Sequence, residues 1–340
     1  MKLINTEDAV GHVLCHDLTQ IIPGVTKDAV FRKGHIVTEE DIPVLLSIGK
    51  EHLYVWEKQE GMLHEDEAAQ ILFDMCKNDY LIPSETKEGK IEIKAGIDGL
   101  FKVDTQRLMK LNTIGEMMIA SRHGNFPVKK GDKLAGTRII PLVIEEEKMR
   151  RAQQVVGEEP LMQLLPFGHK KAAIVTTGSE VFKGRIEDKF GPVIRKKLGE
   201  YDVEVLGQSI MDDKQEEITK EILKWIDKGA DMIVCTGGMS VDPDDTTPSA
   251  IKGTGAKIIS YGAPVLPGAM FLLSYYKGSI PIMGLPGCVM YAARTIFDLV
   301  LPRVMAGEIL DQEELAKYGH GGLCLGCEEC TFPNCGFGKA

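Results

Sequence analysis

The sequence has no stretch of about 18 uncharged apolar residues, so we expect no transmembrane helix. It begins without a basic segment followed by an apolar run, so we expect no secretory signal. Basic residues are in the minority: the formal net charge is −10 over 340 residues, which argues against nucleic acid or an anionic membrane as the main partner. Internal repeats and low-complexity runs are also absent. These absences predict a cytoplasmic protein. The length of 340 residues predicts two or three domains.

The chain has eight cysteines, and they are unevenly placed. Cys15, Cys76, Cys235 and Cys288 are scattered, and in a reducing compartment we expect them to be buried thiols. The other four are spaced C-x2-C-x2-C-x4-C, close to the ferredoxin-type run C-x2-C-x2-C-x3-C that holds an iron–sulfur cluster. Structural zinc is the second alternative, and four free thiols on a flexible tail are the third. The cluster or zinc ligands would be Cys324, Cys327, Cys330 and Cys335.

The part of the chain before residue 170 is heterogeneous. Thr38 and Asp41 predict an N-capped helix that ends near Gly49 and precedes a strand. Helical spacing follows in HEDEAAQILFDMCKN, and residues 90–144 predict short strands joined by glycine turns, as in a small barrel or sandwich. We divide the whole chain into an N-terminal segment, a mixed helix and β-rich region, a linker, an α/β domain and a cysteine-rich tail, at 1–58, 59–150, 151–169, 170–306 and 307–340.

From about residue 170 onward, apolar strands alternate with helical segments. KAAIVTTGSE, DVEVLGQSIM and ADMIVCTGG have the pattern of strands, and EDKFGPVIRKKLGEY and DKQEEITKEILKWIDKG that of helices. This alternation predicts an α/β fold, with a parallel or mostly parallel sheet flanked by helices, behind a mixed α/β and β-rich N-terminal half. Ligands of such sheets collect at the carboxyl ends of the strands.

Three glycine-containing loops fall at these predicted strand ends. They are TTG at 176–178, TGG at 236–238 and GLPG at 284–287. Their backbone N–H groups are suited to a phosphate or another oxyanion. A tight turn between a strand and a helix also needs glycine for its geometry alone, so any single loop leaves both interpretations open.

Acidic residues lie beside the second loop, in CTGGMSVDPDDTTPSA. Next to a bound anion they would be unfavourable without a cation, so they predict either Mg²⁺ bridging carboxylates and phosphate or capping of the loop. We assign the functional role first to Asp245 and expect Asp242 and Asp244 to shape the loop. Further carboxylates at predicted strand ends would complete a ring, namely Glu180, Asp212 and Asp213.

TTGSEV, MDD, TGGMSVDPDD and GLPG, in this order, resemble the molybdopterin-binding domain shared by molybdenum insertases (MoeA-like) and molybdopterin adenylyltransferases (MogA-like). The resemblance covers about residues 170–306, and VLPGAM is similar to the family's proline–glycine loop. It implies a Mg²⁺-assisted site for molybdopterin or adenylated molybdopterin in molybdenum cofactor biosynthesis, with AMP release on molybdate insertion. Molybdate would be the second small molecule, and tungsten is an alternative to molybdenum.

The resemblance also implies roles for individual residues. Asp245, Glu180, Asp212 and Asp213 would be catalytic, and Asp245 and Asp244 would ligate Mg²⁺. We further expect a homo-oligomer, and a molybdoenzyme or redox protein as a partner. The implied pterin- and phosphate-binding residues are Thr177, Gly178, Ser179, Thr236, Gly237, Gly238, Ser240, Asp242, Thr247, Pro267, Gly268, Gly284, Pro286 and Gly287.

The type of function stays open between four alternatives. As an enzyme, the protein would be a transferase of molybdopterin molybdotransferase or adenylyltransferase type. The absence of the insertase segment SAMDGYA favours a molybdopterin carrier or sensor without chemistry. TTGSEVFKGRIEDKF also resembles the opening of CinA-like proteins, which cleave nucleotide pyrophosphates, with Asp188 on that pattern's aspartate. The fourth alternative makes the cysteine tail an electron-transfer accessory.

Overall fold

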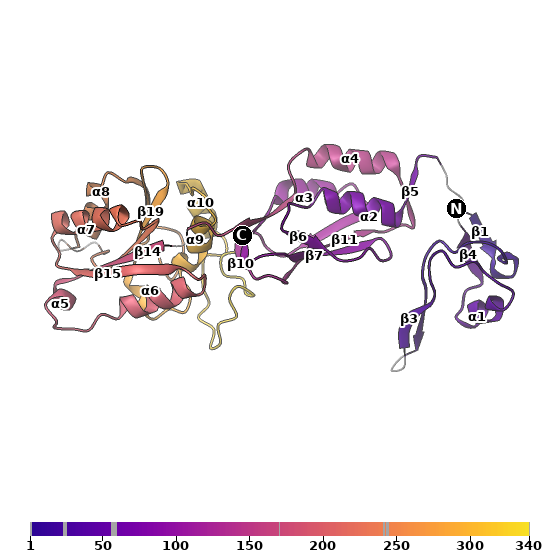
Figure 1. The fold of residues 1–340 in the computed structure, drawn as a ribbon, viewed down its shortest axis with the longest axis horizontal. Helices are drawn as coiled ribbons and strands as arrows, with labels where there is room; N and C mark the ends of the chain where they lie inside the picture. The colour runs from indigo at the N-terminus through magenta and orange to yellow at the C-terminus, as the bar shows by residue number, and fades with distance from the viewer. Residues whose placement is uncertain are drawn as a thin grey trace. The chain divides into compact units, whose positions relative to one another are not determined.

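The computed structural model describes residues 2–22, 26–55, 60–169, 171–240, 242 and 245–339 (Figure 1). The chain forms two compact units and passes between them more than once. Unit 1 comprises Met1–Gly96, Val103–Arg122 and Gly131–Gln163, and unit 2 comprises Ile97–Lys102, His123–Lys130 and Leu164–Ala340.

The first part of unit 1 contains six short elements. They are β1 Lys2–Asn5, η1 Thr6–Asp8, β2 Leu18–Ile22, β3 Thr26–Phe31, α1 Asp41–Ser47 and β4 His52–Val55. β1 pairs with β4 and β2 with β3, both antiparallel. Leu14, Leu45 and Leu53 are buried together between these elements. The helix expected after Thr38 is α1, and the Asp41 carboxylate accepts the Thr38 N–H at 2.8 Å.

The rest of unit 1 combines a four-stranded sheet and the antiparallel pair of β5 and β12 with three helices. Its elements are β5 Met62–His64, α2 Glu65–Asp74, β6 Leu81–Pro83, β7 Lys90–Ala95, α3 Thr105–Asn112, β9 Met117–Ser121, β11 Lys133–Ile139, β12 Val143–Glu145 and α4 Glu146–Val156. The expected barrel or sandwich is wrong, because the strands form a four-stranded antiparallel sheet in the order β6-β7-β11-β9. Leu72 and Phe73 of α2 are buried, so helices rather than a second sheet cover its apolar face (Figure 1). α4 begins before the expected linker at 151–169 and extends into it, and the helix buries Met149, Ala152 and Val156.

Unit 2 contains the predicted α/β fold, which the structure confirms. Its strands are β8 Gly99–Val103, β10 Phe126–Val128, β13 Met162–Pro166, β14 Lys171–Thr177, β15 Glu204–Met211, β16 Met232–Thr236, β17 Lys257–Tyr261, β18 Leu272–Tyr276 and β19 Ile280–Leu285. Its helices are α5 Ser179–Phe182, α6 Phe190–Gly199, α7 Gln215–Asp227, α8 Thr247–Gly253, η2 Gly287–Met290, α9 Ile296–Met305, α10 Gln312–Ala316 and η3 Lys317–Gly319. The main sheet has the order β15-β14-β16-β19-β18-β17, and β10-β8-β13 form a smaller sheet. β15, β14, β16 and β19 are parallel, whereas β18 and β17 run antiparallel to their neighbours.

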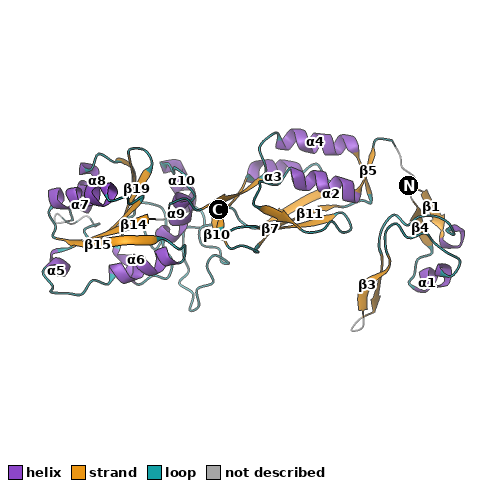
Figure 2. Ribbon diagram, in the orientation of Figure 1, coloured by secondary structure: helices purple, strands orange, loops and turns teal. Residues whose placement is uncertain are grey.

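Alternate residues of the central strands explain the two helical layers (Figure 2). Successive side chains of a strand point to opposite faces of the sheet. Ile174 of β14 joins the core formed with α6 and α9, whereas Val175 joins the core formed with α7 and α8. Both faces are therefore buried, which is why β14 is apolar at residues 172–175 and β16 at residues 232–235.

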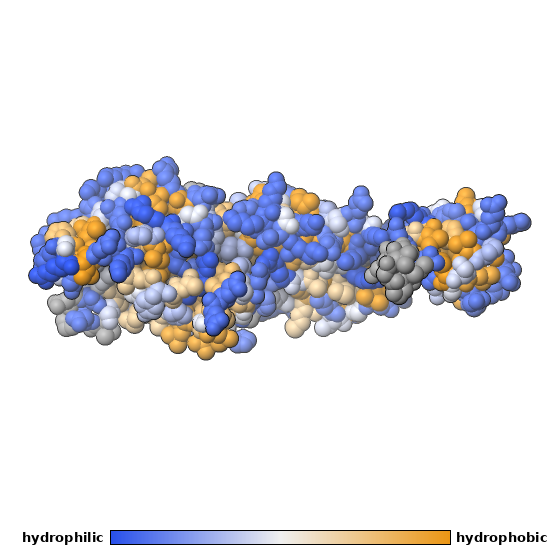
Figure 3. All heavy atoms as spheres, turned by 90° about the horizontal axis from the view of Figure 1, so that it is seen from below, coloured by the Kyte–Doolittle hydropathy of each residue, from blue (hydrophilic) through white to orange (hydrophobic). Residues whose placement is uncertain are grey.

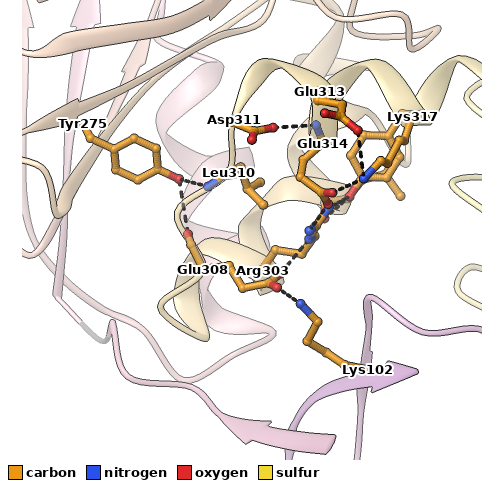
Figure 4. Close-up of polar contacts among 11 residues, drawn as sticks. Lys102, Tyr275, Arg303, Glu308, Leu310, Asp311, Glu313, Glu314 and Lys317 are labelled. Atoms are coloured by element: carbon orange, nitrogen blue, oxygen red, sulfur yellow. Dashed lines mark hydrogen bonds and ion pairs between the residues drawn. The ribbon is translucent and has the colours of Figure 1, made fainter. Parts of the chain in front are cut away.

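The buried Arg303 forms ion pairs with two glutamates of the C-terminal part of unit 2 (Figure 4). Arg303 lies on α9, where all residues are buried, and its guanidinium donates to Glu308 at 2.7 Å and to Glu314 at 2.6 Å. Lys102 of β8 also forms an ion pair with Glu308. Because a buried charge is stable only when it is paired, these contacts hold α10 and the loop before it against α9. The C-terminal tail that follows α10 therefore begins next to α9.

Three of the four scattered cysteines are buried as expected, and Cys288 is partly exposed. Burial raises the pKa of the Cys76 and Cys235 thiols to about 12, so both stay protonated at neutral pH. No helix in the described part of the chain is long and apolar enough to cross a membrane. The face drawn in Figure 3 is mainly hydrophilic, with its apolar residues in separate patches.

Candidate functional site

The parallel strands of unit 2 end at a common edge. In the sheet register, Thr177 of β14 lies opposite Met211 of β15, and Thr236 of β16 lies between Thr176 and Leu285. The loops that follow these residues begin with Gly178, Asp212, Gly237 and Pro286. The sequence motifs of four separate loops thus start at the same edge, which is where α/β sheets bind ligands.

The glycines of the loop after β16 are required by close packing. Gly237 has φ +83°, and a Cβ there would lie 2.1 Å from the Thr177 carbonyl oxygen. Gly238 has φ +52°, and a Cβ there would lie 2.8 Å from Thr247 Oγ1. Thr177 Oγ1 and Thr247 Oγ1 are hydrogen-bonded at 2.9 Å in the buried layer beneath. The loop backbone therefore lies directly on a pair of threonine side chains, and no side chain fits between them.

Two side chains hold the next part of this loop. The Ser240 N–H donates to Asp245 Oδ2 at 2.5 Å. The Tyr261 hydroxyl donates to the Met239 carbonyl at 2.9 Å and contacts the Ser240 carbonyl at 3.2 Å. Partial burial and the Asp245 charge raise the pKa of Tyr261, so its hydroxyl remains a donor. Asp245 thus has a definite structural role, because it orients the Ser240 backbone.

The acids predicted at the strand ends come within electrostatic reach of one another. Asp213 Oδ2 accepts the Ser179 N–H at 2.7 Å. The pKa of Asp213 is raised by burial and, against the effect of that hydrogen bond, by the charges of Asp212, Glu180 and Asp245. No three His, Cys, Asp or Glu side chains are already gathered around one point in the ranges that the structure describes. The edge is therefore a region of concentrated negative charge rather than a preformed metal cage.

The remaining predicted residues after β14 and β16 have different environments. Gly178 has φ +136° and precedes α5. Thr236 is buried, and its hydroxyl donates to Thr176 Oγ1 at 3.1 Å. Asp242 is exposed, and Asp244 lies outside the described residues.

The predicted proline and glycine residues of the two remaining loops, at 284–287 and 267–268, also have different environments. Gly284 lies inside β19, where a Cβ would meet the Met239 side chain at 2.5 Å, whereas Pro286 and Gly287 begin η2. Pro267 follows a cis peptide bond, and Gly268 is packed against Ile296, whose Cγ2 would lie 2.5 Å from an added Cβ. Packing therefore accounts for Gly284 and Gly268, while Gly287 has open space around it.

Sequence reasoning missed a hydrogen-bonded group beneath the edge. Gln208 Nε2 donates to Thr176 Oγ1 at 2.9 Å and to Asp188 Oδ2 at 2.6 Å. Gln208 is one polar residue within a strand and belongs to no motif, so no signal marked it. The structure also shows that Thr246 Oγ1 is buried without a hydrogen-bond partner among the described residues. An orphaned buried hydroxyl beside Asp245 is a candidate ligand contact.

A family described as a probable molybdopterin binding domain matches residues 173–306. This match covers most of the α/β domain. The match spans the loops after β14, β15, β16 and β19, and it ends just after α9. A second family, described only as a domain of unknown function, matches residues 3–57.

Curated relatives of the chain include several named CinA-like protein. The one from Mycobacterium avium (strain 104) is 39% identical over 77 residues, which is 23% of this chain and 18% of the relative. The one from Mycobacterium tuberculosis (strain ATCC 25618 / H37Rv) is 38% identical over 77 residues, with the same coverage. The chain thus spans less than a fifth of the length of these relatives.

Solved structures of cofactor biosynthesis proteins are also similar. The molybdopterin biosynthesis enzyme MoaB from Thermus thermophilus is 23% identical, with a TM-score of 0.34 over 41% of this chain and 98% of its own. Tungsten cofactor synthesizing protein MoaB from Pyrococcus furiosus is 22% identical, with a TM-score of 0.31 over 40% of this chain and 88% of its own. A molybdenum cofactor biosynthesis protein from Pyrococcus furiosus is 12% identical, with a TM-score of 0.27 over 93% of this chain and 64% of its own. At these TM-scores the similarities carry no argument about function.

The carboxylate edge of the α/β domain predicts a dependence of the free energy of unfolding on pH. Because the folded-state pKa of Asp213 is raised, its stabilising contribution is complete below the pKa of an unfolded aspartate and is lost as pH rises through the folded value. In this window the Asp213 contribution to the free energy of unfolding falls with rising pH, whereas paired acids such as Asp104 and Glu314, whose pKa values are lowered, contribute in the opposite direction. We therefore expect Asp213→Asn, in metal-free protein, to make the free energy of unfolding rise more steeply with pH than it does in the wild type. Denaturant unfolding at a series of pH values measures both slopes.

Asp227→Asn is the matched control, because Asp227 is an exposed acid at the end of α7. Its slope should equal that of the wild type. Equal slopes for the wild type and Asp213→Asn would show that Asp213 does not carry this effect.

Proposed function

We propose that the carboxyl edge of the main sheet binds molybdopterin or adenylated molybdopterin through its phosphate groups, together with Mg²⁺. The observation that supports the proposal best is that a glycine loop and a group of carboxylates lie at the same edge of the sheet. The glycine loop held by Asp245 and Tyr261 lies beside the concentrated carboxylates, and both fall within the residues that match the molybdopterin-binding family. A phosphate and a divalent cation together satisfy a site that offers backbone N–H groups and carboxylates at once.

The phosphate contacts in this proposal come from the loop backbone and nearby hydroxyls. Gly237 and Gly238 have no side chains, so a ligand can approach the loop backbone closely at these two residues. The Thr246 hydroxyl, which has no partner in the described part of the protein, would donate to a phosphate oxygen. Ser240 is exposed at the same loop and would supply a second hydroxyl.

The charges of the edge fit Mg²⁺ brought in with the substrate. Mg²⁺ is commonly held by one or two carboxylates plus substrate phosphates, so a preformed group of three ligands is not needed. Asp245 and Asp213 each use one carboxylate oxygen for a backbone N–H, which fixes the direction of the other oxygen. When bound, Mg²⁺ would neutralise both these carboxylates and the pyrophosphate of an adenylated pterin.

The reaction in this proposal is molybdate insertion with release of AMP. The chain's own part is to hold the pyrophosphate against the loop of residues 237–240, with the Asp245 carboxylate oriented beside it. A rigid loop matters because electrostatic stabilisation works through groups that need no reorganisation during the reaction. Asp245, Asp212, Asp213 and Glu180 supply the negative charge that retains the metal.

Two further candidates have specific support. The absence of a SAMDGYA segment favours a carrier or sensor that binds the pterin and releases no AMP. The similarity to CinA-like proteins favours a nucleotide pyrophosphatase. Asp188, which would be the aspartate of that pattern, already accepts the Phe190 N–H at 2.9 Å and the Gln208 amide at 2.6 Å. It fixes the start of α6, and this favours the pterin proposal over the pyrophosphatase.

The experiment is anaerobic incubation of the protein with adenylated molybdopterin, Mg²⁺ and molybdate, followed by measurement of retained pterin and released AMP. AMP release that depends on molybdate supports insertion. Retained pterin without AMP supports the carrier. Hydrolysis of ADP-ribose with no retained pterin would overturn the proposal in favour of the pyrophosphatase.

The other implications of the resemblance stay predictions. They are a homo-oligomer, a molybdoenzyme or redox partner, and the choice between molybdenum and tungsten. A metal held by the cysteine tail is a separate proposal, and the pterin site does not depend on it.

A further inference from the structure

Backbone hydrogen bonds hold the cysteine tail against the α/β domain. Leu266 donates its N–H to the Gly322 carbonyl at 2.9 Å, and Cys324 donates its N–H to the Leu266 carbonyl at 2.8 Å. At the other end of the tail, the Gly338 N–H donates to the Gly321 carbonyl at 2.9 Å. The segment between these contacts is therefore a closed loop, drawn in yellow in Figure 1 and without helix or strand in Figure 2.

Aromatic side chains hold the same loop against the core. Phe337 is 4% exposed, and its ring centroid lies 6.2 Å from that of Phe332. Phe332 in turn lies 5.8 Å from Phe126 of β10, and the Arg294 guanidinium lies 5.0 Å from the centre of its ring. Ordering a glycine-rich segment costs conformational entropy, and this apolar burial offsets it. The described residues of the tail are therefore packed against the core of the domain.

All four tail cysteines line one cavity. It has a volume of about 580 Å³ and is bounded by Pro267 and residues 291–294 of the domain on one side and by the tail on the other. Cys324 and Cys335 are partly buried and pack against the core, whereas Cys327 and Cys330 are exposed. Backbone contacts thus bring cysteines from both ends of the loop to a common space.

The spacing of the cysteines separates the candidate occupants. The cavity of about 580 Å³ is open to solvent and has room for a polynuclear cluster as well as for one ion. The spacing C-x2-C-x2-C-x4-C is close to the run that holds iron–sulfur clusters. Structural zinc more often uses two C-x2-C pairs separated by a longer loop.

We propose that Cys324, Cys327, Cys330 and Cys335 ligate one iron–sulfur cluster in this cavity. Within the described ranges, no three ligating side chains are yet gathered around one point, so the loop closes around the cluster as it binds. The exposed Cys327 and Cys330 have room to move inward, because they stand between the fixed ends of the loop. Arg294 lines the same cavity and places a positive charge beside the thiolates.

The test is anaerobic reconstitution of the full-length protein with Fe²⁺ and sulfide, followed by removal of unbound ions. We expect iron and sulfide in equal amounts, about four of each per chain for a four-iron cluster, with a visible absorbance. Cys327→Ser and Cys330→Ser should each lower bound iron at least about fivefold, because a hydroxyl is a poor ligand for a cluster held by thiolates. Both positions are exposed, so the metal-free variants should unfold at the wild-type temperature.

Cys288→Ser is the matched control, because Cys288 is a partly exposed cysteine outside the tail, and it should load as the wild type does. Removal of iron from the wild type by a chelator should bleach the absorbance and lower the unfolding temperature, and this readout needs no variant. One zinc per chain without sulfide, or equal iron loading by the Cys→Ser variants and the wild type, would overturn the proposal.

Discussion

Gly237→Ala is expected to weaken molybdopterin binding by at least about tenfold, which corresponds to about 1.4 kcal/mol. At φ +83° an alanine is strained by about 1–2 kcal/mol. Its Cβ would also lie 2.1 Å from the Thr177 carbonyl oxygen, which belongs to the buried β14 and cannot yield cheaply. The loop must therefore move away from the sheet edge, and its backbone N–H groups move with it. Equilibrium binding of pterin and denaturant unfolding measure the two effects.

Gly255→Ala is the control that separates backbone strain at positive φ from the steric clash of the added Cβ. Gly255 has φ +84° but nothing within 4 Å of an added Cβ. We expect it to lose about 1–2 kcal/mol of unfolding free energy and to keep wild-type pterin affinity. Unchanged affinity in Gly237→Ala, with the protein folded, would show that this loop does not contact the ligand.

Asp245→Asn is expected to reduce Mg²⁺-dependent AMP release by about 100- to 1000-fold, the usual effect of removing one electrostatic group at a reacting phosphate or carbonyl. An asparagine Oδ1 can still accept the Ser240 N–H, which the aspartate accepts at 2.5 Å, so the loop keeps its orientation. The lost charge is what changes, and the Mg²⁺ concentration needed for half-maximal pterin binding should rise. AMP release and pterin retention, titrated with Mg²⁺, give both values.

Asp202→Asn is the control for Asp245→Asn. Asp202 is exposed in the same domain and has φ +56°, a conformation that asparagine tolerates well. Its Mg²⁺ dependence should match the wild type. If Asp245→Asn also matches the wild type, Asp245 acts only as a loop acceptor and not through its charge.

The architecture of unit 2 could be predicted because its local patterns agree with its tertiary structure. β14 and β16 each contain a run of four apolar residues, at 172–175 and 232–235, which is the pattern of a strand buried on both faces, and glycine follows each strand. From this alternation the strand ends could be placed at one edge, and with them Asp212, Asp213 and Asp245. Glu180 also followed from its position just after a strand end.

Other features depend on contacts between residues distant in sequence. The sheet over residues 90–144 was expected to close on itself, but α2, which precedes it, covers its apolar face. Gln208 and Thr246 belong to no motif, and only their neighbours reveal a bridging amide and an orphaned hydroxyl. Gly284 was predicted as part of a phosphate loop, and the structure places it inside β19 with the end of the Met239 side chain packed on it. Spacing alone carries no information about such partners.

Equilibrium dialysis of molybdopterin against the full-length protein, with and without Mg²⁺ under anaerobic conditions, tests the central proposal most directly. The account predicts about one pterin retained per chain, with tighter retention when Mg²⁺ is present and displacement by inorganic pyrophosphate. Wild-type protein that retains no pterin in the presence of Mg²⁺, or retains it equally after saturation with pyrophosphate, would contradict phosphate recognition at the carboxyl edge.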